Sequence, residues 1–138
     1  MKKFKFKNLK LGQKTLLKIK LTSKMHNQYV RLSGDDSPFH TSKKFVNRYG
    51  FKDKIIHGML IGAHYSKLIG TLLPGNFSIE GQMNIHFHYP CYVNDIIEIK
   101  AKIVKLIKFN KLCDIEIKTF NQKKKLVSSA ITKIKLME

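Results

Sequence analysis

The segment GMLIGAHYSKLIGTLL, residues 58–73, constrains the fold of this chain more than any other part of the sequence. It has the length of a helix, contains three glycines and carries one charged residue, Lys67. Its apolar residues recur near helical spacing, at positions 59, 60, 63, 68 and 72. A helix so poor in charge is buried on almost every side, so other parts of the chain have to cover it. Pro74 and Gly75 are expected to stop it.

Four long segments follow this helix, and apolar residues alternate with polar ones along them. They span residues 78–90, 95–109, 111–120 and 125–137. Alternation with a period of two is typical of strands with one buried face. The polar pairs Asn110-Lys111 and Asn121-Gln122 predict hairpin turns. One buried helix followed by such strands predicts an α+β domain, in which a curved antiparallel sheet wraps around the central helix.

The N-terminal half predicts one more strand and two short helices. Residues 16–22 alternate as a strand does. The next segment can form a short helix, with Ser23 as its N-cap and Gly34 at its end. The residues that mark the second helix are Thr41 or Ser42 as its N-cap and Gly50 as its closing glycine.

Length and composition fit one globular domain over residues 1–138. Apolar residues make up 43% of the chain, too many for a disordered protein. No stretch approaches the about 18 uninterrupted apolar residues of a membrane span, so no membrane insertion is expected. The basic N-terminus has no apolar run behind it, unlike a signal peptide. Because Cys91 and Cys113 have neither a metal-type spacing nor the number of a disulfide framework, we expect a cytoplasmic protein.

The net charge of +18 first suggests a nucleic-acid-binding protein. Lysine supplies almost all of the excess, and arginine occurs only at Arg31 and Arg48, although arginine is the better reader of phosphates and bases. The lysines also alternate with apolar residues, as in residues 97–108, which is typical of the solvent face of a sheet. We therefore do not expect nucleic acid as a partner, whereas an acidic or phosphorylated partner fits the charge.

A polar loop holds two of the nine carboxylates, Asp35 and Asp36, shortly before His40. Pro38 biases the preceding Ser37 toward extended geometry, so the chain bends between Asp35 and His40. Such a bend can bring a carboxylate and an imidazole into one small volume, where they can hold a water molecule and take its proton. The alternative is a polar turn that caps a short helix. These residues by themselves leave both interpretations open.

The start of the buried helix is a second place suited to chemistry. Its first N–H groups have no partners within the helix and carry partial positive charge. Gly58 would let a ligand approach this backbone closely, which suits a carbonyl oxygen that gains negative charge during a reaction. The alternative is that Gly58 allows tight packing of the helix against the sheet.

Taken together, these two regions resemble the MaoC-like (R)-specific enoyl-CoA hydratases. Residues 29–40, YVRLSGDDSPFH, resemble the hydratase motif of that family, an aromatic residue followed by Ser/Thr-Gly-Asp-x-Asn-Pro-x-His. Residues 56–60, IHGML, resemble the start of its central helix. The later segments that resemble the family are residues 73–75 and 89–95, so the likeness covers residues 10–136. Ser37 stands where the family usually has Asn, which predicts a changed hydrogen-bond network in this loop.

The resemblance implies a hot-dog fold and a homodimer whose active sites lie at the subunit interface. It implies a lyase of fatty acid metabolism that adds water reversibly, with syn geometry, to a trans-2-enoyl thioester and forms the (R)-3-hydroxyacyl thioester. Asp35 and His40 would hold the water, with Asp35 as the base and His40 orienting the water or delivering a proton to Cα. The Gly58 N–H would polarise the thioester carbonyl. No metal and no redox cofactor is expected, and coenzyme A or acyl carrier protein would carry the acyl group, with lysines near the site meeting its phosphates or acidic helix.

Other residues have secondary places in this interpretation. The residues that support the two motifs are Ser33, Gly34, Ser37, Pro38 and His57. Ser66 and Ile69, on the central helix, are expected to shape the acyl pocket. The remaining histidines that we considered, His64, His86 and His88, are interpreted first as structural or polar-face residues.

Three alternative functions stay open on the sequence. A thioesterase is possible because hot-dog folds also host thioesterases, although the hydratase motif argues against it. A basic nucleic-acid-binding module is the alternative from another functional class. A family member that binds acyl groups without turning them over is disfavoured by the intact Asp35, His40 and Gly58. The sequence does not give the acyl chain length, the carrier or the physiological direction.

Overall fold

The computed structural model describes residues 4–75 and 77–137 of the chain. After a short 3-10 turn at Phe6–Asn8, the described residues form four helices and five strands. The helices are α1 (Ser23–Ser33), α2 (Pro38–Thr41), α3 (Lys43–Asn47) and α4 (Gly58–Thr71). The strands are β1 (Lys14–Lys20), β2 (Ser78–Phe87), β3 (Ile96–Ile107), β4 (Leu112–Phe120) and β5 (Leu126–Leu136). None of the helices is long and apolar enough to cross a membrane.

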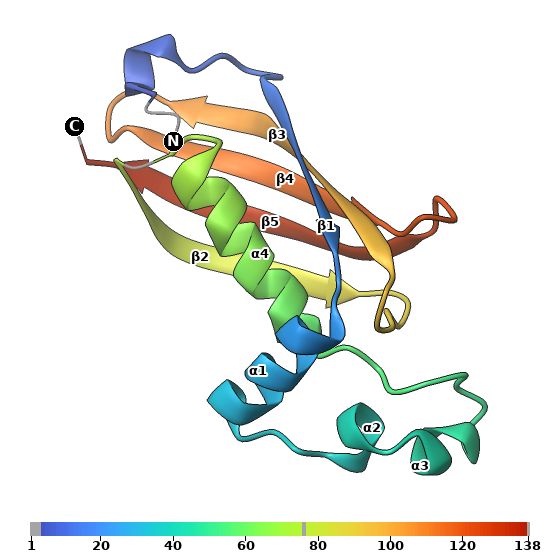
Figure 1. Ribbon diagram of the computed structural model, residues 1–138. Coiled ribbons are helices and arrows are strands. Elements are labelled where there is room, and N and C mark those ends of the chain that lie inside the picture. Colours follow the sequence, from blue (N-terminus) through green and yellow to red (C-terminus); the bar gives the residue numbers. More distant parts are fainter. Residues whose placement is uncertain (1–3, 76, 138) are drawn as a thin grey trace.

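The five strands form one antiparallel sheet in the order β1-β3-β4-β5-β2. Helix α4 lies across one face of this curved sheet (Figure 1). The expected fold class, an α+β domain with a curved antiparallel sheet wrapped around a central helix, is therefore confirmed. The strand expected at residues 16–22 is shifted, since β1 runs from Lys14 to Lys20, and α4 ends at Thr71, two residues earlier than expected.

Strand β3 shows how the alternating sequence builds the core. Ile97, Ile99 and Ile103 are fully buried, whereas Lys100 and Lys102 between them are exposed. Successive side chains of a strand point to opposite faces, so one face carries the isoleucines and the other the lysines. Strands β4 and β5 repeat the pattern. Much of the lysine excess thus covers the solvent face of the sheet, as the sequence predicted.

Helix α4 fills the concave face of the sheet with apolar side chains and one hydroxyl. Leu60 and Leu68 are buried in the core. Tyr65 is also fully buried, and its hydroxyl forms hydrogen bonds with the hydroxyls of Thr119, at 2.7 Å, and Ser128. Buried polar groups need such partners, because an unpaired hydroxyl in the core is costly. These bonds tie the middle of α4 to strands β4 and β5.

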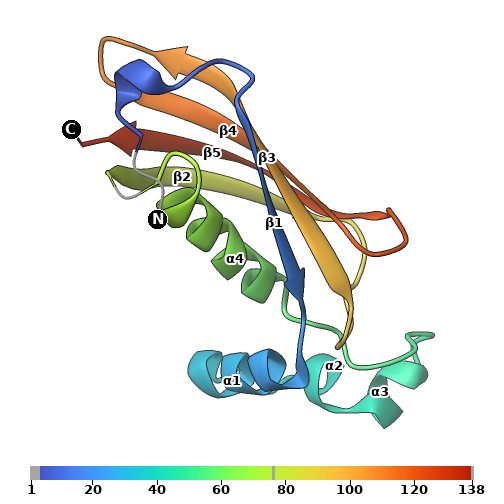
Figure 2. The same ribbon diagram turned by 45° about the horizontal axis from the view of Figure 1, so that its top comes forward.

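Residues 22–57 form a helical arm that leaves the sheet after β1 and returns to it at α4. Figure 2 shows α1, α2 and α3 lying beyond the end of the sheet. The arm has a small aromatic cluster of its own. The ring of Phe39 lies 5.1 Å from that of Phe45, 5.5 Å from that of Tyr49 and 6.4 Å from that of Phe51. Aromatic pairs at these separations stabilise a segment that the main core does not cover.

The start of α1 differs from the sequence prediction by one residue. Thr22, not Ser23, is the N-cap: its backbone is extended, and its hydroxyl accepts a hydrogen bond from the Met25 N–H at 3.2 Å. Ser23 is already the first helical residue, because β1 ends earlier than expected and the connection to α1 is correspondingly early. The end of the helix is as predicted, since Gly34 adopts a left-handed conformation with φ of 71°.

The second part of the arm contains a helix that the sequence did not predict. Pro38 begins α2, where its fixed φ suits the first helical position. Of the two residues considered as the next N-cap, Ser42 has that role for α3 and accepts from the Phe45 N–H at 3.2 Å. The Thr41 hydroxyl donates to carbonyls of the preceding loop instead. Gly50 lies in the turn after α3 with φ of 81°, as expected of a closing glycine.

Candidate active site

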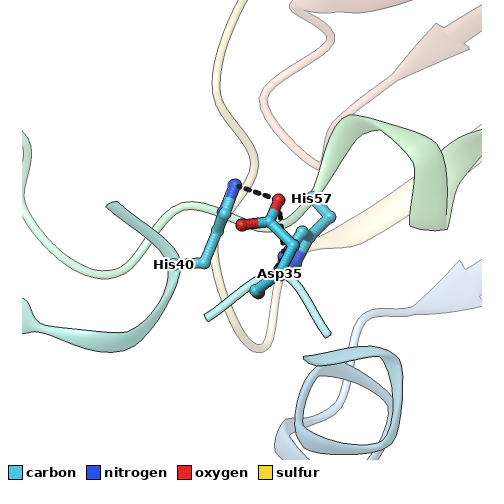
Figure 3. Close-up of side chains that lie close together, drawn as sticks. All are labelled: Asp35, His40 and His57. Carbon is cyan, nitrogen blue, oxygen red and sulfur yellow. Dashed lines mark hydrogen bonds and ion pairs between the residues drawn. The ribbon is translucent and has the colours of Figure 1, made fainter. Parts of the chain in front are cut away.

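The helical arm brings three side chains together at the start of α4. Asp35 lies between α1 and α2, His40 lies in α2, and His57 directly precedes α4. Figure 3 shows the Asp35 carboxylate beside both imidazoles. Its Oδ2 atom lies 3.8 Å from Nε2 of His40 and 3.5 Å from Nε2 of His57. The bent loop expected between Asp35 and His40 is therefore present, and it brings the two side chains close together.

The loop around Asp35 is held by short-range hydrogen bonds. The Ser33 hydroxyl donates to the Tyr29 carbonyl at 2.8 Å and accepts from the Asp35 N–H at 3.2 Å. The Ser37 N–H donates to Oδ1 of Asp35, also at 3.2 Å. Ser37 itself has ψ of 139°, the extended geometry expected before Pro38. Because Oδ1 is occupied, Oδ2 is the carboxylate oxygen that faces the two histidines.

The orientation of His40 follows from its other ring nitrogen. Nδ1 lies 2.7 Å from the Ile55 carbonyl oxygen, which can only accept, so Nδ1 carries a proton. Neutral His40 therefore has an unprotonated Nε2, and that atom faces Asp35. The 3.8 Å between Nε2 and Oδ2 is too long for a direct hydrogen bond. At such a distance a water molecule can bridge the two groups.

His57 supports the pair from the buried side. Its Nε2 lies 3.0 Å from the Asp35 carbonyl oxygen and therefore donates a proton to it. Its ring stacks on that of His40 with centroids 3.6 Å apart, and the Tyr29 ring packs against it at 5.0 Å. Burial lowers the pKa of His57 below its ordinary value. His57 is thus a neutral hydrogen-bond donor that orders the Asp35 loop.

His26 is a site neighbour that the sequence analysis did not single out. It lies on α1, is 1% exposed, and its Nε2 donates to the His40 carbonyl oxygen at 2.7 Å. Burial lowers the pKa of this histidine as well. Helical spacing could have found it, because positions 26, 29 and 33 fall on one face of a helix that ends at the Asp35 loop.

Asp35, His40 and His57 each offer a metal-ligating atom, and these atoms lie within 4.8 Å of one another. Two imidazoles and a carboxylate are a ligand set that several transition metals accept. However, Nε2 of His57 carries the proton that it donates to the Asp35 carbonyl, and a protonated nitrogen cannot bind a metal. This hydrogen bond occupies Nε2 of His57, so a metal ion bound through that atom would require its proton to be lost.

Gly58 begins α4, and no side chain caps this helix end. The first N–H groups of the helix are therefore free of side-chain acceptors, as the carbonyl-binding interpretation requires. Gly58 also has a packing role: a Cβ at this position would lie 2.7 Å from the ring of Phe87. The packing interpretation is thus confirmed, while the role toward a carbonyl stays a prediction.

A hollow of about 640 Å³ lies between α4 and β2, and two neighbours of Gly58 line it, Met59 in the chain and Phe87 in space. Its lining includes Met59, Ala63, Ser66, Met83, Ile85 and Phe87. Ser66, one of the two expected pocket residues, therefore lines this hollow. Ile69, the other, is buried in the core cluster and is not part of the lining. The core encloses the Ile69 side chain, which is 3% exposed, whereas Ser66 is exposed and can reach the hollow.

The remaining histidines and the cysteines are not among the side chains that meet at Asp35, His40 and His57. Burial lowers the pKa of His64 in α4. His86 and His88 are exposed, and the Nε2 atom of His88 forms a hydrogen bond with the Ser129 hydroxyl at 2.9 Å. Cys91 and Cys113 are free and buried, and burial raises the pKa of both thiols to about 12. Neither cysteine has the depressed pKa of a nucleophilic thiol.

Comparisons with known proteins identify the family to which this fold belongs. The family described as "MaoC like domain" matches residues 6–125. The chain belongs to this MaoC-like family. A 3-hydroxybutyryl-CoA dehydratase of Methylorubrum extorquens is 30% identical over 102 residues, which cover 74% of this chain and 65% of that protein. An (R)-specific enoyl-CoA hydratase of Aeromonas caviae is 28% identical over 115 residues, or 83% of this chain and 86% of that protein.

A solved structure extends the likeness to three dimensions. It is that of an (R)-hydratase from A. caviae involved in PHA biosynthesis, and it matches with a TM-score of 0.89 at 27% identity. The match covers 94% of this chain and 98% of that one. The comparisons thus place this MaoC-like chain among hydratases and dehydratases, and they confirm the hot-dog fold and the family that the sequence motifs predicted.

Proposed function

We propose that this MaoC-like protein adds water reversibly to a trans-2-enoyl thioester and forms the (R)-3-hydroxyacyl thioester. One observation carries the proposal: Oδ2 of Asp35 and Nε2 of His40 face each other at 3.8 Å, while the other polar atom of each side chain is already bonded. This geometry suits one water molecule held by a base and by a second proton-transfer group. Membership of a family that includes named hydratases supports the same reaction.

In the hydration direction, Asp35 takes a proton from the held water as its oxygen bonds to Cβ of the enoyl group. The electron pair of the double bond moves toward the thioester carbonyl, giving an enolate. Asp35 passes the proton taken from the water to the free Nε2 of His40, and His40 delivers it to Cα, so that the double bond becomes a single bond. Asp35 is then again a carboxylate and Nε2 of His40 is again unprotonated, which restores both groups. Water and enoyl thioester are the only reactants, so the scheme requires neither metal nor redox cofactor.

Gly58 supplies the third component of this scheme. The enolate oxygen gains negative charge, and N–H groups at a helix start stabilise such charge. Helix α4 is 14 residues long and has no side-chain cap, which supports this use of its first N–H groups. The role assigned to Gly58 is to donate its N–H to the thioester carbonyl and to keep this approach open.

The acyl chain fits the hollow between α4 and β2. Met83 and Ile85 give it an apolar wall. Its polar residues include Ser66 on the helix side and Glu80 on β2, whose carboxylate accepts from the Thr132 hydroxyl. Apolar walls with a few polar groups are typical of sites for small molecules with hydrocarbon parts. The carrier at the other end of the thioester is coenzyme A or acyl carrier protein, and both are acidic enough to be attracted by a chain of net charge +18.

A homodimer is part of the proposal. Strand β2 forms one edge of the sheet. Two apolar side chains on it are exposed, Ile79 to 56% and Phe87 to 50%. The Asp35 carboxylate is also half exposed. A second copy that covers this edge would protect the apolar residues and exclude water from the open side of the site. Light scattering of the purified protein tests this part, and a stable monomer would contradict it.

The main test is hydration of crotonyl-CoA, followed as loss of the enoyl absorbance, with product configuration measured by an (R)-specific dehydrogenase. We expect Asp35→Asn and His40→Ala to lower kcat by roughly 10²–10⁴-fold while the protein stays folded. Asp36→Asn is the matched control, because it removes the neighbouring exposed carboxylate and should keep activity. Inactivity of the wild type with both crotonyl-CoA and crotonyl-acyl carrier protein would overturn the proposal.

The same samples test the thioesterase alternative. A thioesterase would release the free thiol of the carrier, which a thiol reagent detects, whereas a hydratase leaves the thioester intact. We expect no thiol release above the uncatalysed rate. Thiol release that Asp35→Asn abolishes, without hydration, would assign the site to the alternative.

A further inference from the structure

His40 is held by hydrogen bonds at its backbone as well as at its ring. Its N–H donates to the Ser37 carbonyl at 2.8 Å, and its Nδ1–H donates to the Ile55 carbonyl. Its own carbonyl lies at the C-terminal end of α2, where a helix four residues long leaves such groups without partners. Among the described residues, the side chain that bonds to that carbonyl is that of His26, whose Nε2–H donates at 2.7 Å.

His26 is an unexpected residue at a buried helix position. It is 1% exposed, and because Nε2 must carry the proton, Nδ1 is an acceptor. That atom is buried and has no hydrogen-bond partner among the described residues. An apolar side chain would avoid this unsatisfied nitrogen, so packing alone does not explain a histidine here. The bond to the His40 carbonyl is the feature that requires a donor.

A parallel arrangement holds the other catalytic group. His57 donates its Nε2–H to the Asp35 carbonyl, as His26 does to the His40 carbonyl, and the two supporting rings lie 5.7 Å apart. Each of the two residues that face the water position is thus fixed at its backbone by one buried histidine. The sequence motif contains His57, whereas His26 lies outside it.

We infer that His26 is a positioning residue that fixes the backbone of His40 and so keeps its Nε2 facing Asp35. The inference rests on the proposed function, in which His40 transfers a proton at Nε2. Without the bond from His26, the end of α2 can turn, and His40 moves relative to Asp35. A displacement of about 1 Å can lower a rate by about 10²-fold. Substrate affinity should change less, because His26 lies behind His40 and not in the acyl hollow.

The test compares His26→Leu, which fills the space without a donor, with His26→Gln, which offers an amide N–H at similar reach. We expect kcat for crotonyl-CoA to fall about 10- to 100-fold in His26→Leu, with KM nearly unchanged, as for other residues that orient an active-site group. His26→Gln should recover most of kcat. His64→Leu is the matched control, since it removes another histidine with an unsatisfied buried nitrogen but lies outside the site.

A second readout does not depend on activity. Long-range proton–nitrogen NMR should show protonated Nε2 for His26 and His57, protonated Nδ1 for neutral His40, and altered His40 nitrogen shifts in His26→Leu. Unaltered His40 shifts in a folded His26→Leu protein would overturn the inference, as would full kcat in that variant. A glutamine variant no better than the leucine variant would also overturn it. If the wild type shows no hydratase activity but the His40 shifts respond as stated, the proposed function fails and the positioning contact stands.

Discussion

The sheet with α4 and the helical arm of residues 22–57 are stabilised by different interactions. In the sheet, buried positions recur every second residue and are filled by side chains such as Ile115 and Ile117, both fully buried. In the arm, two buried side chains near the active site are histidines, His26 and His57, each bonded to a backbone carbonyl. Apolar burial is non-directional, whereas a hydrogen bond fixes an orientation.

This difference matches the separate roles that we propose for the arm and for the sheet with α4. A thioester site needs a carboxylate and an imidazole at a set distance, and directional bonds to Asp35 and His40 meet that need. The sheet and α4 supply a rigid edge for the arm and the helix start at Gly58. Stability and activity should therefore respond to different substitutions, and each of the following experiments tests whether the two responses are separate.

The largest effect on stability should come from Ile117→Ala in the middle of β4. The side chain is fully buried against the core, so its truncation should lower the free energy of unfolding by about 2–5 kcal/mol. Denaturant unfolding measures this change. Turnover per folded molecule should stay near the wild-type value at low temperature, because the residue is not in the arm. A large loss of kcat in the folded variant would contradict the separation.

Gly58 stands where the two regions meet, so its substitution tests both at once. Gly58→Ala would place a Cβ 2.7 Å from the ring of Phe87, and because this half-exposed ring can move aside, the cost should be about 1 kcal/mol, the low end for overpacking. The backbone itself permits alanine, since Gly58 is not among the glycines with positive φ. Combining it with Phe87→Leu should restore stability. If Gly58 also binds the thioester carbonyl, the added Cβ should lower kcat, and kcat should stay low in the double variant. Recovery of both stability and kcat in the double variant would mean that Gly58 has a packing role alone.

The sequence predicted the sheet well because alternation is a local signal that burial enforces. The segments expected at 95–109, 111–120 and 125–137 became β3, β4 and β5 with small changes at their ends. The central helix was also predicted, because a nearly uncharged helical segment has to be buried. The motif identified Asp35 and His40 as neighbours, and the structure brings them to 3.8 Å.

The arm was predicted less well, because its contacts join residues distant in the sequence. The bond from His26 to His40 spans 14 residues and that from His57 to Asp35 spans 22. Helical spacing can place His26 on the face of α1 toward the Asp35 loop, but it does not predict the partner of either histidine. Helix α2 was missed since four residues are too few for a periodic signal. Ile69 was expected at the acyl pocket but lies in the core, because the side of α4 that meets the sheet could not be assigned from a helix that is apolar all round.

Acid should destabilise the arm, because its buried histidines are more easily protonated in the unfolded chain. Burial lowers the pKa of His26 and His57 below the ordinary value of 6.5. The unfolded chain therefore binds protons more readily than the folded one, so stability is constant above pH 6.5 and falls as the pH drops through 6.5 toward the lowered values. His64 in α4 shifts in the same direction, but two of these three groups lie in the arm.

Hydrogen exchange over that pH range can locate the acid effect. After correction for the intrinsic pH dependence of exchange, amides of residues 22–57 should lose protection before those of β3 and β4. His26→Gln removes one of the titrating groups and should flatten the dependence. Simultaneous loss of protection in the arm and the sheet would show that the two regions open as one unit.

The smallest expected effects on stability and activity together come from the N-cap of α1, where Thr22 and Ser23 should respond differently to substitution. Thr22 caps α1 through its hydroxyl, which accepts from the Met25 N–H, whereas Ser23, favoured by the sequence, is the first helical residue. Thr22→Ala should lower the free energy of unfolding by about 1 kcal/mol, and Ser23→Ala should leave it nearly unchanged. Denaturant unfolding of both variants measures the difference. Because α1 carries His26, fraying of α1 in Thr22→Ala should also lower kcat slightly. A loss of stability without any change in kcat would mean that the N-terminal turn of α1 opens without moving His26.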